Sequence, residues 1–159
     1  MKKLFFALAI AATCFTGCLQ KDYETNQPNC DIVKTKAPDA EIANLRAYLT
    51  SNSITAAEDG RGFFYSITTA GNSNTPKPCN VVTVTYAGRL TNGTLFDSGT
   101  ITYGLYQLIT GWQEGLPLIG VGGKITLYLP PSLAYGASGS GTIPPNANLI
   151  FDIELKGFN

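Results

Sequence analysis

The only Trp in the chain, Trp112, stands between Gly111 and Gly115 in the segment LITGWQEGL (residues 108–116). Four other aromatic residues lie at the ends of predicted elements or beside Gly, Asp or Pro: Tyr86, Phe96, Tyr135 and Phe151. Such side chains can line a pocket that binds an apolar ligand by removing it from water. Core packing is the alternative interpretation for Trp112. A Trp that only fills core volume needs no flanking glycines, so a pocket is the hypothesis to test.

The composition excludes several kinds of catalysis. The chain has no His, which removes Ser-His-Asp and Cys-His arrangements, imidazole bases and the commonest zinc ligand. It has no Cys-x-x-Cys spacing or acidic cluster that would suggest a metal site. The segment GVGGKI does not match a phosphate-binding loop, because Leu118 occupies the position of the first Gly and Ile125 follows the Lys. We therefore expect no metal and no cofactor.

The charge pattern argues against nucleic acid as a partner. The 159 residues contain 11 Lys and Arg against 11 Asp and Glu, with no basic run. Nucleic-acid binding requires a concentration of positive charge that this sequence lacks.

The predicted elements begin with one amphipathic helix. In PDAEIANLRAYLTSN, Ile42, Leu45 and Leu49 fall on one helical face, which predicts a helix over residues 38–53. Asp39 is the predicted N-cap, and Asn52 stands near the helix end.

After this helix the apolar pattern changes to alternation, which predicts strands. The segments are GFFYSI, VVTVTY, KITLYL and NLIFDIEL, and Asn92-Gly93 predicts a two-residue hairpin loop. A short helix should carry Trp112, Leu116 and Ile119 on one face, with Pro117 discouraging its continuation. The predicted fold class is α+β: an antiparallel β-sheet wrapped around a short α-helix, with an extra N-terminal helix.

The N-terminus has the composition of an export signal. Lys2 and Lys3 precede the apolar run LFFALAIAATCFTG, which is too short to span a bilayer. It ends in FTGC, which resembles a bacterial lipobox, so residues 1–17 are predicted to be a lipoprotein signal peptide and Cys18 the lipidated residue. An ordinary secretory signal cleaved nearby is the alternative.

Residues 18–37 are then a polar tether that holds the protein to the outer membrane of the bacterial envelope. The segment LQKDYE within it resembles a signal for export to the cell surface, or it is only solvated linker. The remaining cysteines, Cys30 and Cys79, favour a disulfide in an oxidising compartment, with free thiols as the alternative.

Three segments together resemble the FKBP-type peptidyl-prolyl cis–trans isomerases, while the preceding helix, the Cys pair and the lipobox resemble Bacteroidota envelope members of that family. The three segments are VTVTYAGRLTNGTLFDSG, LITGWQEGL and PPSLAYGASGSGTIPPNANLIFDIEL, and their order and spacing match over about residues 78–158. The resemblance implies an isomerase domain over residues 62–159. It implies rotation about X-Pro bonds of polypeptide clients, and macrolide inhibitors as further ligands. A single short N-terminal helix favours a monomer.

The resemblance also implies roles for matching residues. The proline pocket would be lined by aromatic and aliphatic side chains and one carboxylate: Tyr86, Phe96, Trp112, Phe151, Leu108, Ile109, Ile101, Ile143 and Asp97. Trp112 would be its floor, Gly111 would allow a sharp turn into the helix, and Gly115 would keep the far side of that helix thin.

Polar groups at three matching positions would complete the site. The Ile109 backbone N–H would donate to it, the Tyr135 hydroxyl would face a substrate carbonyl, and Asp97 would lie on the rim. Asp97 could instead close an Asx turn, and Tyr135 could be a buried hydroxyl with a backbone partner. A rival function is a binding module that holds proline-containing peptides with little catalysis.

Overall fold

The computed structural model describes residue 30 and residues 34–159, so the predicted signal peptide and Cys18 lie outside the described residues. The helices are α1 (Asp39–Ser51) and α2 (Thr110–Gly115). The strands are β1 (Ala57–Glu58), β2 (Phe64–Thr69), β3 (Val81–Leu90), β4 (Leu95–Gly104), β5 (Lys124–Leu129) and β6 (Leu149–Phe158). Three short 3-10 helices, η1 (Leu105–Gln107), η2 (Leu116–Leu118) and η3 (Pro131–Leu133), complete the described elements.

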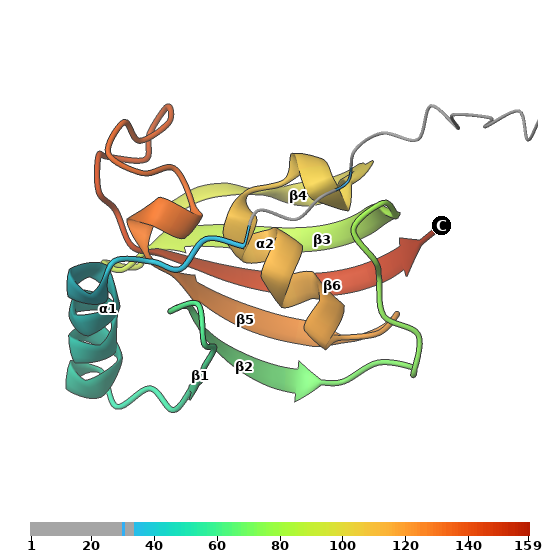
Figure 1. The fold of residues 1–159 in the computed structure, drawn as a ribbon, viewed down its shortest axis with the longest axis horizontal. Coiled ribbons are helices and arrows are strands. Elements are labelled where there is room, and N and C mark those ends of the chain that lie inside the picture. Colours follow the sequence, from blue (N-terminus) through green and yellow to red (C-terminus); the bar gives the residue numbers. More distant parts are fainter. Residues whose placement is uncertain (1–29, 31–33) are drawn as a thin grey trace, which may run out of the picture.

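The six strands form one antiparallel sheet in the order β1-β2-β5-β6-β3-β4. The sheet curves around α2, which crosses one face, while α1 lies at the end of the sheet (Figure 1). This confirms the predicted fold class. Strand β6 shows why alternation identified it: Leu149, Phe151, Ile153 and Leu155 are all buried against α2 and its neighbours.

Helix α2 lies unusually close to β5 because two of its residues have no side chain. A Cβ atom on Gly111 would come within 3 Å of the Leu129 side chain, and one on Gly115 within 3 Å of Leu127. Gly111 has no positive φ angle, so the expected sharp turn is not its role. Both glycines permit close helix–sheet packing, and this packing presses Trp112 into the core at 4% exposure.

The hairpin between β3 and β4 differs from the predicted two-residue loop. Gly93 N–H donates to the Leu90 carbonyl and Leu90 N–H donates to the Thr94 carbonyl, each at 2.9 Å, so three residues form the loop. Gly93 has φ +88° while Asn92 is not in the left-handed region. A type I turn followed by a left-handed Gly has this pattern, whereas the two-residue loop needs positive φ at both positions. The Asn92 side chain accepts the Thr94 N–H at 3.0 Å.

Helix α1 buries Ile42, Leu45 and Leu49, as its periodicity predicted. The predicted N-cap is wrong, because Asp39 is the first helical residue and Pro38 occupies the cap position. Pro38 has no N–H to leave unpaired there, and the Asp39 carboxylate instead accepts a hydrogen bond from the Lys36 ammonium at 2.9 Å.

The polypeptide before α1 is attached at two points to segments that connect strands of the sheet. Cys30 and Cys79 are joined by a disulfide with 5.1 Å between their Cα atoms. Closing a loop of this length lowers the entropy of the unfolded chain, which stabilises the folded state by about 4 kcal/mol. Further along, the Ala37 N–H donates to the Arg61 carbonyl at 2.9 Å, and Ala37 is buried. No helix in the described part of the chain is both long and apolar enough to cross a bilayer.

Candidate active site

A cavity of about 80 Å³ opens where five parts of the fold meet. Its lining comes from β3, β4, the segment before and within α2, the loop after η3, and β6. The lining residues are Tyr86, Asp97, Ile101, Leu108, Ile109, Trp112, Tyr135 and Phe151. The fold therefore brings together eight of the ten residues predicted for the pocket.

Trp112 is packed on two sides by aromatic edges. Its ring centroid lies 5.2 Å from that of Tyr86 at an interplanar angle of 76°, and 5.2 Å from that of Phe151 at 90°. Edge-to-face contacts of this kind place the positive edge of one ring against the negative face of another. The two interpretations of Trp112 are thus both correct, since one side chain is a core residue and part of the cavity lining.

Two predicted pocket residues lie behind the lining. Phe96 packs edge-on against Phe151, with ring centroids 5.6 Å apart at 86°. Ile143 is 8% exposed, and its backbone pairs with Ser140 in the loop after η3. Phe96 therefore supports the cavity by holding the Phe151 ring.

Asp97 and Tyr86 form a hydrogen-bonded pair across β3 and β4. The Tyr86 hydroxyl donates to the Asp97 carboxylate at 2.5 Å, so this carboxylate is engaged by a neighbouring strand. Burial of the phenol, and then the neighbouring Asp97, raise the pKa of Tyr86 to about 12. Tyr135 is 37% exposed at the rim, and its pKa is raised by burial and by Asp97. Its hydroxyl is therefore neutral near pH 7 and available to donate.

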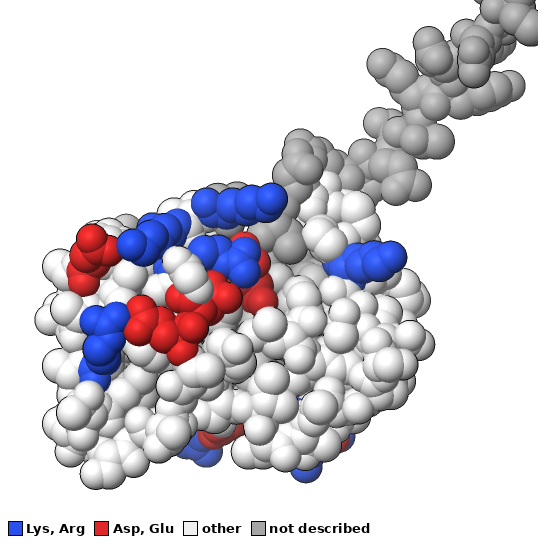
Figure 2. Space-filling model, turned by 60° about the horizontal axis from the view of Figure 1, so that its bottom comes forward, with Lys and Arg blue, Asp and Glu red and all other residues white. Residues whose placement is uncertain are grey.

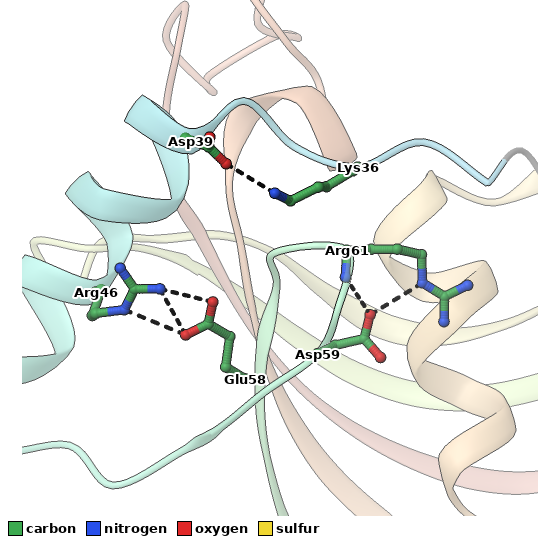
Figure 3. A network of polar contacts seen from close by, with 6 residues as sticks. All are labelled: Lys36, Asp39, Arg46, Glu58, Asp59 and Arg61. Atoms are coloured by element: carbon green, nitrogen blue, oxygen red, sulfur yellow. Dashed lines mark hydrogen bonds and ion pairs between the residues drawn. The ribbon is translucent and has the colours of Figure 1, made fainter.

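The cavity walls carry almost no formal charge. Between Arg89 and Asp152 the only charged residues are Asp97, Glu114 and Lys124, and Asp97 alone lines the cavity. Charged side chains gather instead over α1 and the turn after β1 (Figure 2). Arg46 pairs there with Glu58 at 2.7 Å, and Arg61 with Asp59 at 3.1 Å (Figure 3).

Sequence reasoning missed the polar residues that anchor α2. Glu114 forms an ion pair with Arg61, and it is only 6% exposed. Burial raises the pKa of Glu114, while Arg61 opposes that rise. Gln113 is equally buried, and its side-chain amide bonds backbone carbonyls in the segment before α2. The only available signal was the adjacent Gln-Glu pair in a short segment with apolar neighbours.

Comparison with known proteins assigns the chain to a family. The sequence model of FKBP-type peptidyl-prolyl cis-trans isomerases matches residues 72–156. The chain belongs to this family. The resemblance expected from the sequence is thereby confirmed at family level, while its lipoprotein detail stays a prediction. Strand β2 and the N-terminal helix lie before the matched region.

Relatives within the FKBP family include longer proteins. The probable isomerase FkpA of Neisseria meningitidis is 44% identical over 120 residues, which cover 69% of this chain and 43% of that protein. FkpA of Aeromonas hydrophila is 39% identical over 138 residues, covering 79% of this chain and 50% of that protein. The chain thus spans half or less of the length of these curated relatives.

Solved FKBP structures confirm the architecture. The crystal structure of FkpA from Escherichia coli superposes with a TM-score of 0.69 at 35% identity, covering 76% of this chain and 60% of that chain. An isomerase from Pseudomonas syringae pv. tomato superposes at 0.67 and 31% identity, covering 79% of this chain and 98% of that chain.

Gly88 tests the packing behind the cavity. A Cβ atom on Gly88 would lie 2.6 Å from the Phe96 ring and 2.9 Å from the Phe151 ring. We expect Gly88→Ala to displace these rings and to destabilise the protein by about 1–3 kcal/mol, as overpacking does. Urea unfolding measures this. Gly99→Ala is the control, because a Cβ atom there meets nothing within 4 Å. Equal stability of the two variants would contradict the packing.

Tyr86 provides a test by pH. Its folded-state pKa of about 12 lies above the ordinary value of 10.0. The phenol therefore contributes stability that is complete below pH 10 and is lost as the pH rises toward 12. Ultraviolet titration of wild type minus Tyr86→Phe should show this late ionisation. Asp97→Asn should lower the pKa without returning it to 10, since burial is the larger cause. A difference titration centred at 10 in wild type would refute the assignment.

Proposed function

We propose that this protein catalyses cis–trans isomerisation of X-Pro bonds in polypeptides of the bacterial envelope. The observation that carries the proposal is the aromatic cavity lined by Trp112, in a chain that belongs to the FKBP family. Proline is the apolar ring such a cavity would bind, and a polypeptide is its natural source.

The reaction suits a site built from rings. Rotation about an X-Pro bond has a barrier of about 20 kcal/mol, because amide resonance is lost as the bond twists. The twisted amide is less dipolar than the planar one and loses less on leaving water. A cavity lined by Trp112, Tyr86 and Phe151 therefore favours the twisted state over the ground state. A rate gain of roughly 10⁴ requires only about 5.5 kcal/mol of such preference.

Positioned polar groups complete the proposed mechanism. The Ile109 N–H would hold one carbonyl of the peptide while the other side of the X-Pro bond turns. The Tyr135 hydroxyl at the rim would donate to a second carbonyl. Asp97 would add negative charge at the mouth, and its hydrogen bond to Tyr86 keeps both groups in place. No proton is transferred and no covalent bond forms, which is consistent with a chain that contains no His.

A protease-coupled assay on a short peptide with one X-Pro bond tests this function. We expect Trp112→Ala, Phe96→Ala and Asp97→Ala each to lower kcat/KM about tenfold or more, because each disturbs the cavity or its support. Leu95→Ala is the matched control: Leu95 precedes Phe96 on β4 but is 53% exposed, so its removal should leave turnover unchanged.

Two outcomes would redirect the proposal. Turnover unaffected by all three variants would reject the assigned cavity. Negligible wild-type turnover with retained peptide binding would favour the binding module. A macrolide inhibitor of the family, which we expect to occupy the same cavity, provides the competition control.

We further propose that the protein is a lipoprotein anchored through Cys18. The support is the sequence pattern of residues 1–17 and FTGC. The mature protein should partition into the detergent phase, and Cys18→Ala should abolish this. Unchanged partitioning of the variant would refute lipidation, and protease treatment of whole cells would distinguish the two membrane faces.

A further inference from the structure

The proposed peptide donor, the Ile109 N–H, belongs to a segment that is held by a side chain of α2. Gln113 is 6% exposed, and its Nε2 donates to the Leu108 carbonyl at 2.7 Å and to the Tyr106 carbonyl at 3.1 Å. Its Oε1 is buried and has no hydrogen-bond partner among the described residues. The side chain is therefore used only as a donor, with both amide hydrogens engaged.

The Leu108 carbonyl and the Ile109 N–H are the two ends of one peptide group. The described residues contain no cis peptide bond, so this group is planar and trans. Its carbonyl and its N–H therefore point in opposite directions. Fixing the Leu108 carbonyl toward Gln113 aims the Ile109 N–H away from Gln113, on a residue that lines the cavity.

The remaining backbone bonds restrict the same segment from both sides. Leu108 N–H donates to the Leu105 carbonyl at 3.2 Å, and the Ile109 carbonyl accepts Trp112 N–H at 2.9 Å and Gln113 N–H at 3.2 Å. The Ile109 N–H itself does not take part in these bonds. A carbonyl that accepts a hydrogen bond also polarises its peptide group, which strengthens the N–H at the other end as a donor.

We propose that Gln113 is a positioning residue that orients the Ile109 N–H toward the bound peptide. This inference rests on the proposed isomerase function and deepens it. It requires a side chain that donates, because both of its contacts are carbonyl oxygens. A carboxylate has the same shape but only accepts, so Glu at this position would face two carbonyl oxygens without a hydrogen to offer.

Gln107 provides an internal control, because its side chain accepts a hydrogen bond whereas that of Gln113 donates. Its Oε1 accepts the Gly104 N–H at 3.2 Å, in the same segment and on an exposed side chain. Gln107→Glu therefore keeps its hydrogen bond, whereas Gln113→Glu loses two. The same chemical change at the two positions separates the loss of a donor from the gain of a negative charge near the cavity.

The experiment measures kcat/KM from pH 5 to 8 for wild type, Gln113→Met, Gln113→Glu and Gln107→Glu, with the folded fraction of each confirmed by circular dichroism. Gln113→Met, which has similar volume and no donor, should lose about tenfold in kcat/KM. Gln113→Glu should lose as much near pH 8 and recover as the pH falls, because a protonated carboxyl can donate to the Leu108 carbonyl. Wild type and Gln107→Glu should show no such recovery. A purely structural role would leave the pH profile unchanged at constant folded fraction.

A second measurement does not depend on turnover or on stable variants. In ¹⁵N–¹H NMR of the wild-type protein, a short proline peptide should shift the Ile109 amide downfield as its N–H gains an acceptor. An unmoved Ile109 amide at peptide saturation, Gln113→Met within twofold of wild type, or equal profiles for the two Glu variants would each overturn the inference. If wild type shows no turnover, the isomerase proposal fails, while the Ile109 amide still reports on peptide binding.

Discussion

The contacts of Trp112 with Tyr86 and Phe151 bring together three of the rings that line the cavity. The two edge-to-face contacts hold the indole from β3 on one side and β6 on the other. They can form only if α2 approaches the sheet closely, and Gly111 and Gly115 make that approach possible against β5. A side chain at either glycine would push the helix outward and remove Trp112 from between its two partners. The site therefore depends on the absence of two side chains as much as on the presence of three rings.

Polar contacts at both ends of α2 fix its remaining freedom. The side chain of Gln113, within α2, donates hydrogen bonds to the Tyr106 and Leu108 carbonyls in the segment before the helix. On the outer side of α2, Glu114 pairs with Arg61. The backbone carbonyl of Arg61 in turn accepts a hydrogen bond from the Ala37 N–H of the N-terminal segment. A buried ion pair contributes little net stability, since desolvation offsets its attraction. Because Glu114 is 6% exposed, its pairing with the partly exposed Arg61 side chain attaches α2 to the turn after β1.

The N-terminal helix extends this support to the other wall of the cavity. The Glu41 carboxylate accepts the Ser132 N–H at 2.9 Å, which attaches α1 to η3 at the start of the loop that carries Tyr135. Ile42 packs over Gly62, and Arg46 lies 5.8 Å from the Phe64 ring centroid. Although α1 lies before the region that the family model matches, its Glu41 attaches it to η3, which precedes the loop that carries Tyr135.

The sequence was informative wherever burial repeats with a regular period. Alternation located β6, and helical spacing located Ile42, Leu45 and Leu49. Eight of the ten predicted pocket residues line the cavity because the family resemblance supplied positions that periodicity alone could not. The two-residue strand β1 is too short for any period to show. The Asp39 cap was wrong because the helix begins one residue earlier, with the Pro38 carbonyl accepting the N–H groups of Glu41 and Ile42.

The polar contacts of Gln113 and Glu114 could not be predicted, since they pair with partners fixed only by the folded chain. Arg61 and Glu114 are 53 positions apart in the sequence. Many charged side chains gather over α1 and the turn after β1, and others pair on the sheet, as Arg89 of β3 does with Asp152 of β6. Under the proposed function, a neutral peptide group would enter a site whose lining carries one carboxylate, that of Asp97.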